Sequence, residues 1–593
     1  MNKKNPEDKT LQMVSGEKLG LALSGGGFRA SFFHIGVLAQ MAMLGLLRHI
    51  EVISTVSGGS IIGALYYIHL KKLLEEKADN EITDQDYINE IEKIEHEFLQ
   101  GVQRNIRMRT FSNPFKNIRM SRANYSRSDC IGELYDRYFY RNVLDANRKT
   151  PIEMRELKIR PEGKDFYPPT DNVGRKAKVP ILLINATTLN TGHNWRFEAS
   201  HMGEPPRMDN VAREIDKNLR LRRPPSYEAI ITKQQNIELG LAVAASACVP
   251  ALFHPLAISD LYSDNIRVQL VDGGVHDNQG IQGLIDEMCT KFVVSDASGQ
   301  MGDEREPATG IAPVLFRMNS ILMDRVREEQ ISRLFHQFDI NRSRVAFMHL
   351  RKGLPAKAVS WIGPNGKPAE EIKMERQPEA TSEDFGVAKS VQDLLSHFRT
   401  DLDSFTEVEA YSLMSDGYQM SREEFNRASG IKKMISSERI DDTPKWNFMA
   451  IAHWMQNPSP EYIKHLEVGG QRLFKVFRLS SLLTILTSCF GIGILIAFWI
   501  LIKDEVIALF SRSLTLGQIL IAVLVLLSGF IPRLSRVLKV LRFLRKPSEF
   551  LLRLIIRGLL PAVGSLFINV HLWIFDPIFL RRGKLKRLSK FPK

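Results

Sequence analysis

The longest uncharged run in the sequence limits the possible folds more than any other feature. Residues 479–502 form a run of 24 residues without a charge. As a helix this run is about 36 Å long, which exceeds the roughly 30 Å hydrocarbon core of a bilayer. A second, very apolar run at 514–531 is also long enough to span. The two runs predict a transmembrane helical hairpin that follows a large non-membrane part.

The positive charge of the chain is concentrated around these runs. The net charge of +13 hides that residues 471–593 hold 20 Lys and Arg against 4 Asp and Glu, whereas the rest holds 60 against 63. Cations flank the hairpin on both sides, so the positive-inside rule places both of its ends in the cytoplasm. The basic segment 532–593, with its uncharged run at 558–575, is expected to lie at the membrane interface or to re-enter it. The charge therefore indicates an anionic membrane surface as partner, and no nucleic acid.

Length and composition predict three regions. We expect an α/β domain over residues 1–300, a mainly helical cytoplasmic extension packed on it over 301–470, and the membrane region over 471–593. No apolar stretch precedes Leu19, so no secretory signal is expected and the first two regions are predicted to stay on the cytoplasmic side of the inner membrane. The cysteines have no spacing typical of a zinc or redox site, and we expect no metal or cofactor. They are Cys130, Cys248, Cys289 and Cys489.

Near the N-terminus, a short apolar strand leads into a glycine-rich loop and a helix. Residues 18–24 have the strand pattern, Gly25, Gly26 and Gly27 follow, and a helical pattern continues to about Leu47. Successive glycines let backbone N–H groups point at one spot at a helix N-terminus, where the helix dipole favours negative charge. The loop fits neither the phosphate-loop pattern nor the dinucleotide-binding fingerprint. It is either a site for an oxyanion or a phosphate, or a structural tight turn.

The next strand pattern breaks at a serine flanked by small residues. The sequence Thr55-Val56-Ser57-Gly58-Gly59 follows a β-type run from Ile50 and precedes a helical pattern. A sharp strand-to-helix turn of this kind exposes the serine Oγ, and small neighbours avoid steric clashes. The usual pattern is G-x-S-x-G, in which Thr55 here takes the place of the first glycine. Ser57 is thus a candidate nucleophile, whereas Ser60 is expected to cap the following helix.

Several blocks, in order along the chain, resemble the patatin-like phospholipase family. The family's oxyanion loop, G-G-G-x-[KR], is similar to residues 25–29, its serine elbow to the turn at Ser57, and its D-G-[GA] motif to Asp272-Gly273-Gly274. The likeness extends over roughly residues 16–420 and implies a patatin-like α/β core with a central, mostly parallel sheet flanked by helices. Further blocks similar to the family are residues 185–192, residues 245–253, and residues 399–405 with Glu409 and Gly417-Tyr418.

The resemblance implies a catalytic Ser–Asp dyad. Ser57 would be the nucleophile and Asp272 the general base. The residues agree with this physically, since Asp272 ends an apolar strand where partial burial raises the basicity of a carboxylate. The loop of Gly25, Gly26 and Gly27 would stabilise the oxyanion of the tetrahedral intermediate. Arg29 would hold the loop or bind a lipid phosphate. The other supporting residues would be Gly59, Gly273 and Gly274.

These observations predict a membrane-anchored serine hydrolase of lipid carboxylic esters. It would cleave a membrane phospholipid or another acyl-lipid, in the manner of a phospholipase A or lysophospholipase, through an acyl-enzyme. The sequence leaves open an acyltransferase with the same site, and a catalytically silent membrane-tethered binding or signalling module, which Thr55 favours. A Ser-His-Asp triad is less favoured because none of the 14 histidines sits in a motif that singles it out. His276 with Asp277 is the one such pair that we would test.

Overall fold

The computed structural model describes residues 17–588 with several gaps, and it consists of two compact units. The first unit comprises Met1–Thr110, Ala123–Arg472 and Leu580–Lys593, and the second comprises Phe111–Arg122 and Leu473–Phe579. The gaps are residues 121–124, 207–220, 222, 251, 263–264, 300–303, 305, 340–342, 355–385, 437–445, 473–474, 481–482, 490–491, 494–495, 497–498 and 501–559.

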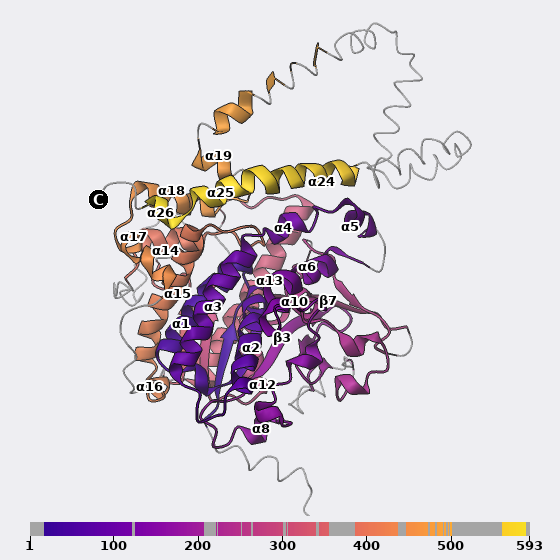
Figure 1. Ribbon diagram of the computed structural model, residues 1–593, viewed down its shortest axis with the longest axis vertical. Helices are drawn as coiled ribbons and strands as arrows, with labels where there is room; N and C mark the ends of the chain where they lie inside the picture. Colours follow the sequence, from indigo (N-terminus) through magenta and orange to yellow (C-terminus); the bar gives the residue numbers. More distant parts are fainter. Residues whose placement is uncertain are drawn as a thin grey trace, which may run out of the picture. The chain divides into compact units, whose positions relative to one another are not determined.

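The first unit is built on a mixed sheet flanked by helices (Figure 1). The strand order is β5-β4-β3-β2-β1-β8-β9, and β6 and β7 join the sheet through the pairing of β7 with β3. Neighbours from β3 to β9 along this order are parallel, whereas β4, β5, β6 and β7 pair antiparallel. The predicted parallel centre is therefore present within a mixed sheet. The strands are β1 Leu19–Leu23, β2 Ile50–Val56, β3 Ile181–Thr188, β4 Asn194–Phe197, β5 Met202–Gly203, β6 Leu256–Ile258, β7 Val268–Asp272, β8 Lys291–Asp296 and β9 Val345–His349.

Helix α1 (Gly27–Met43) follows the glycine loop and is buried along almost its whole length. A helix that is apolar on all sides has to be covered on all sides. Helices α2 (Gly58–Glu76), α3 (Asp84–Val102) and α15 (Glu407–Arg427) provide this cover. The crossing with α15 is so close that a Cβ on Gly36 would lie 1.9 Å from the Met414 carbonyl oxygen.

The two predicted strand–turn–helix units are confirmed as β1–α1 and β2–α2. Helix α12 (Ile281–Asp286) packs on β1 and β2, where its side chains join those of the strands in a buried apolar cluster. The remaining helices are α4 Ile106–Arg109, α5 Pro114–Arg119, α6 Arg127–Tyr135, α7 Arg141–Leu144, α8 Pro168–Asp171, α10 Leu239–Ser246, α11 Gly274–Asp277, α13 Ile311–Arg333, α14 Lys389–Ser396, α16 Ser429–Lys432, α17 Ala452–Gln456, α18 Pro460–Gly469, α19 Lys475–Leu479, α24 Leu560–Val570, α25 Asp576–Arg582 and α26 Leu585–Leu588.

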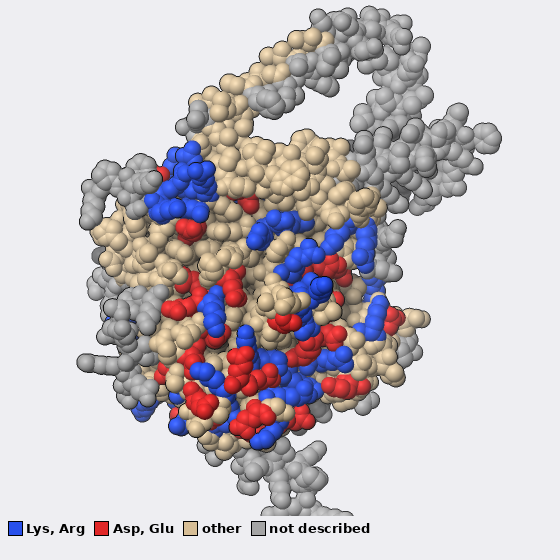
Figure 2. Space-filling model, viewed as in Figure 1, with Lys and Arg blue, Asp and Glu red and all other residues tan. Residues whose placement is uncertain are grey.

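The second unit contains α5 and α24, which are joined by polar contacts. Asn117 Nδ2 donates to Ser565 Oγ at 2.8 Å, and Asn569 Nδ2 donates to the Ser112 carbonyl at 2.9 Å. The outer side chains of α24 are apolar, and Phe567 is 71% exposed. By contrast, acidic and basic side chains are interspersed over the visible face of the first unit (Figure 2).

Within the described residues, one helix is long and apolar enough to cross a membrane. It is Ala562–Arg582, with 21 residues and a mean hydropathy of 1.5 over its most apolar window. This helix overlaps the run at 558–575 that we assigned to the interface from the sequence. Of the predicted hairpin, the run 479–502 is described only in part, and the run 514–531 lies outside the described residues. The hairpin therefore stays a prediction.

Candidate active site

Ser57 occupies the turn between β2 and α2 in a strained backbone conformation. Its φ of 49° and ψ of −115° lie outside the regions that side chains other than glycine ordinarily adopt. The neighbours must be small, because a Cβ on Gly58 would lie 2.2 Å from the Gly27 carbonyl oxygen. A Cβ on Gly59 would lie equally close to the Leu23 carbonyl oxygen. The turn is thus packed closely against the end of β1 and the start of α1, as a sharp strand-to-helix turn of this kind requires.

The register of the sheet brings Asp272 beside this turn. Val56 of β2 pairs with Asn185 of β3, and the next β3 residue, Ala186, pairs with Asp272 of β7. Strand β7 therefore joins β3 at the point where β2 ends. An interaction with the Ser57 hydroxyl lowers the pKa of the Asp272 carboxyl, so the two predicted dyad residues lie near each other.

The Asp272 carboxyl is almost completely buried, with 4% of the residue exposed. Burial raises its pKa from the usual 3.8 to about 6, and hydrogen bonds from the Gly274 N–H and the Ser57 hydroxyl oppose this shift. The Gly274 N–H lies 2.7 Å from Asp272 Oδ1. A carboxyl with this pKa is ionised at neutral pH and is more basic than an exposed aspartate, which suits a general base.

The glycine loop faces the same turn from the end of β1. Gly26 has a φ of 135° and Gly27 a φ of 58°, values that other residues rarely adopt, and the two residues lead into α1. The Gly25 N–H donates to the Asn278 carbonyl at 2.9 Å. Because this N–H is already engaged, we keep Gly26 and Gly27 as the predicted oxyanion donors and assign Gly25 to holding the loop.

The predicted supporting residues lie around the two loops. Arg29 is 2% exposed and donates to the carbonyls of Ser396, Phe398 and Ala297 at 2.9 to 3.1 Å. Burial lowers the pKa of Arg29 to about 10, which leaves it charged at neutral pH. These contacts favour the loop-holding role over binding of a lipid phosphate. Gly273 lies against β3, since a Cβ there would be 2.3 Å from the Asn185 carbonyl oxygen.

Ser246 lies at the site, although no local motif assigns it a role. Its hydroxyl accepts the Ser57 backbone N–H at 3.0 Å and lies 2.8 Å from Ser60 Oγ. Its carbonyl accepts the Gly273 N–H at 3.2 Å, so one residue contacts both loops of the site. The prediction that Ser60 caps α2 is wrong, because its hydroxyl bonds the side chains of Ser246 and Thr55. The only signal in the sequence is the family-like block 245–253.

His34 and Asp277, which lie near the motifs, have partners outside the Ser57 turn. His34 is buried, with Nε2 3.0 Å from the Ser24 carbonyl and Nδ1 2.7 Å from Ser295 Oγ. Burial lowers the pKa of His34 to about 4, so its ring is neutral at pH 7. Asp277, beside His276, accepts the backbone N–H groups at the start of α12. Asp277 therefore fixes the backbone of that turn.

A known protein family matches the part of the chain that contains this site. The family model described as Patatin-like phospholipase matches residues 21–285, which include Ser57, Asp272 and the glycine loop. No curated protein matches the chain.

Solved structures show only a weak likeness. Human GIVD cytosolic phospholipase A2 in complex with methyl gamma-linolenyl fluorophosphonate is 15% identical with a TM-score of 0.23, and the match covers 41% of this chain and 30% of that chain. VipD from Legionella pneumophila is 12% identical with a TM-score of 0.20, over 77% of this chain and 89% of that chain. Since such low scores add nothing to the argument, the assignment follows from the family model: the chain carries a patatin-like phospholipase domain over residues 21–285.

Proposed function

We propose that the chain is a membrane-associated serine hydrolase of lipid carboxylic esters, with Ser57 and Asp272 as its catalytic dyad. The observation that carries this proposal is the register of the sheet, which brings the buried Asp272 carboxyl beside the strained turn at Ser57, where the Ser57 hydroxyl lowers the pKa of that carboxyl. Nucleophile and base within hydrogen-bond reach are the first requirement for a hydroxyl to attack an ester. The family match over residues 21–285 supports the lipid substrate class.

The dyad accounts for both halves of the reaction. Asp272 takes the Ser57 proton as Oγ attacks the ester carbonyl, and the carbonyl π electrons move to its oxygen. The tetrahedral intermediate collapses, the C–O bond to the alcohol breaks, and the protonated Asp272 gives its proton to the leaving oxygen. Water then attacks the acyl-enzyme with Asp272 again as base, and the free fatty acid leaves as Ser57 regains a proton.

The glycine loop would stabilise the oxyanion that forms in each half-reaction. The positive φ angles of Gly26 and Gly27 turn the backbone at the N-terminus of α1, where the helix dipole also favours negative charge. Each backbone donor of this kind contributes about 3 to 4 kcal/mol in hydrolases where it has been removed. These donors belong to a loop that packs closely against the carbonyls of Ala297 and Thr400.

The membrane association that we propose rests on the C-terminal region. Helix Ala562–Arg582 is apolar and would lie at the membrane interface, as expected for the basic segment 532–593, and the run 479–502 with its partner at 514–531 is predicted to form a hairpin. With cations on both sides of the hairpin, the first unit would face the cytoplasm and the basic tail would meet anionic headgroups. The same membrane would then contain the lipid substrate.

Fatty-acid release from phospholipid vesicles by the full-length chain tests this proposal. Ser57→Ala and Asp272→Asn should each abolish release, whereas the exposed-site controls Ser320→Ala and Asp165→Asn should leave it unchanged. A fluorophosphonate probe should label the wild type and fail to label Ser57→Ala. Full activity in either dyad variant would overturn the mechanism. Transfer of the acyl group to a labelled lysolipid, in place of release, would identify an acyltransferase.

A further inference from the structure

The C-terminal segment Gly583–Leu588 is seated on the N-terminus of α15 in the first unit. The Val408 N–H donates to the Gly583 carbonyl at 3.1 Å, and the Leu585 N–H donates to Glu407 Oε2 at 3.0 Å. Gly583 lies directly against Thr406, since a Cβ on Gly583 would be 2.3 Å from Thr406 Cβ. The segment follows helix Ala562–Arg582 in the sequence, and its contacts with α15 are made largely by backbone groups.

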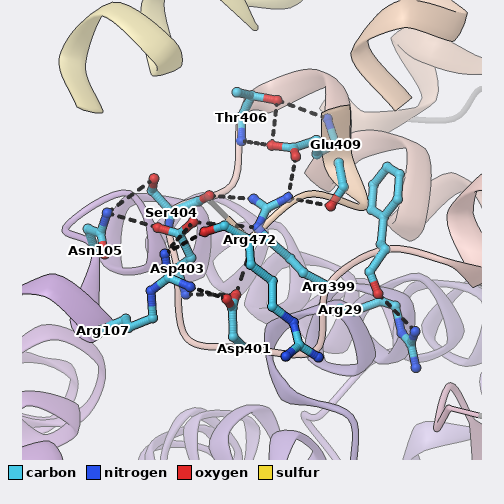
Figure 3. A network of polar contacts seen from close by, with 12 residues as sticks. Arg29, Asn105, Arg107, Arg399, Asp401, Asp403, Ser404, Thr406, Glu409 and Arg472 are labelled. Atoms are coloured by element: carbon cyan, nitrogen blue, oxygen red, sulfur yellow. Dashed lines mark hydrogen bonds and ion pairs between the residues drawn. The ribbon is translucent and has the colours of Figure 1, made fainter. Parts of the chain in front are cut away.

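Thr406 is connected to a buried ion pair. Its N–H and hydroxyl donate to Glu409 Oε2 at 2.7 and 2.9 Å, and this reciprocal cap begins α15. The other oxygen of Glu409, Oε1, accepts from Arg399 Nη1 at 2.5 Å (Figure 3). The Arg399 side chain has no exposed surface, so this pair is shielded from solvent and charge-assisted.

Arg399 has backbone partners as well as Glu409. It donates to the Ser404 carbonyl at 2.5 Å and to the Gly469 carbonyl at 2.7 Å. Its guanidinium also lies 4.0 Å from the centre of the Phe405 ring. A guanidinium whose two Nη atoms bond backbone carbonyls in this way holds the backbone on both of its sides.

The chain segment next to Arg399 lies on the glycine loop. A Cβ on Gly27 would be 2.2 Å from the Thr400 carbonyl oxygen, so the two backbones are in direct contact. Arg29 holds the same segment from the loop side, through the carbonyls of Ser396 and Phe398. The ring of Phe405 packs on that of Phe32 in α1, with centroids 5.4 Å apart.

We propose that the segment Gly583–Leu588 positions the glycine loop, and that it acts through Thr406, Glu409 and Arg399. The contacts run without a break from Gly583 to Gly27. Loss of the segment would loosen the start of α15, then the Arg399 pair, and finally the Thr400 carbonyl against which Gly27 packs. The catalytic consequence rests on the proposed function, because only there does the loop act as the oxyanion site. The segment and Arg399 are positioning elements and do not touch the substrate.

Two pairs of full-length variants test the proposal. Leu585→Pro removes the N–H that bonds Glu407, and proline is tolerated at this first position of a short helix, whereas Leu585→Ala keeps the N–H. Gly583→Val forces a side chain against Thr406, whereas Gly564→Val is its control, because a Cβ on Gly564 would meet nothing within 4 Å. Arg399→Lys keeps the charge facing Glu409 and gives up the planar fork.

Hydrogen exchange and steady-state kinetics provide the readouts. In Leu585→Pro, Gly583→Val and Arg399→Lys, we expect faster amide exchange in a peptide covering residues 24–33, with unchanged exchange in one covering β4. On a soluble short-chain ester, kcat per fluorophosphonate-reactive site should fall about tenfold while KM stays within about twofold, since misplaced groups cost rate more than binding. Both control variants should behave as the wild type.

The two readouts separate the two proposals. If the wild type cleaves no ester, the proposed function fails, and the exchange data alone decide whether the segment positions the loop. Unchanged exchange at residues 24–33 in both Leu585→Pro and Gly583→Val would overturn the positioning role. If Gly583→Val does not fold, Leu585→Pro with its alanine control decides. A fall in kcat that is matched by the alanine control would also overturn it.

Discussion

The Ser57 backbone N–H donates to the hydroxyl of Ser246 at 3.0 Å, across a separation of 189 residues in the sequence. Ser246 also accepts the Gly273 N–H at its carbonyl, next to Asp272. A single residue at the end of α10 thus holds the turn of the proposed nucleophile and the end of the strand that carries the proposed base. We therefore expect the relative position of the two proposed dyad residues to depend on Ser246.

Ser246→Ala should therefore impair both turnover and stability. The variant leaves the Ser57 N–H without its buried acceptor, which costs about 1 to 3 kcal/mol of unfolding free energy, and it frees the turn. We expect kcat to fall about tenfold, because small displacements of the nucleophile are expensive. Urea unfolding and ester cleavage measure the two effects. Ser421→Ala is a matched control, since this buried serine bonds the Gly417 carbonyl in α15; equal kcat losses in both variants would argue against a special role of Ser246.

The pH dependence of turnover should follow the Asp272 carboxyl. Its pKa is raised to about 6 by burial. Below this pH the carboxyl is protonated and cannot take the Ser57 proton, so kcat/KM should rise with pH through about 6 and level off above it. Rates on a soluble ester between pH 5 and 8 measure this profile in the free enzyme. A profile that is flat over this range would contradict the assignment of Asp272 as general base.

Asp272→Asn should stabilise the fold at neutral pH while it abolishes activity. The folded-state pKa of about 6 lies above the unfolded value of 3.8, so the folded state binds the proton more tightly. The wild type accordingly loses stability as the pH rises from about 4 to 6, and it remains less stable above that range. The asparagine variant avoids this cost, and we expect it to gain about 1 to 3 kcal/mol in unfolding free energy at pH 7.5.

A measurement of Asp272→Asn at pH 4 is a control for the sign of this change in stability. At pH 4 the wild-type carboxyl is already protonated in the folded state, so the difference between Asp272→Asn and the wild type should shrink. Asp165→Asn, at a side chain that is 94% exposed, should change stability little at either pH. A variant that is less stable than the wild type at pH 7.5 would show that the hydrogen bonds to the carboxylate outweigh its desolvation.

The parts of the site that the sequence predicted are those encoded within a few residues. The turn at Ser57 and the loop at Gly25 to Gly27 each lie between a strand and a helix whose periodicity is visible locally. Asp272 was found through its position at the end of an apolar strand and through its family motif. The antiparallel pairing of β7 with β3, which brings Asp272 to Ser57, has no local signal, since register depends on contacts between distant segments.

The contacts that the sequence did not reveal join residues far apart in the chain. Ser60 begins a helix, and a cap is the ordinary role for a serine there, but Ser246 and Thr55 provide better partners for its hydroxyl. The Gly25 N–H is taken by Asn278, which follows the Asp272 motif. In both cases the local preference of a residue gives way to a tertiary hydrogen bond within a buried site, where an unpaired polar group would be costly.

Thr55 differs from the usual glycine of the serine turn, and the structure predicts that glycine would be worse here. Its hydroxyl donates to the Leu183 carbonyl at 3.0 Å and accepts from Ser60, and its methyl group packs against Gly63. Thr55→Gly removes these contacts and leaves a small cavity, so we expect a loss of about 2 to 4 kcal/mol in unfolding free energy and a lower kcat. Thr55→Ser keeps the hydroxyl and should retain kcat, at a cost of about 1 kcal/mol for the methyl group. If Thr55→Gly instead matched the wild type in urea unfolding and in ester cleavage, the hydroxyl chain from Thr55 through Ser60 to Ser246 would have no part in holding the turn.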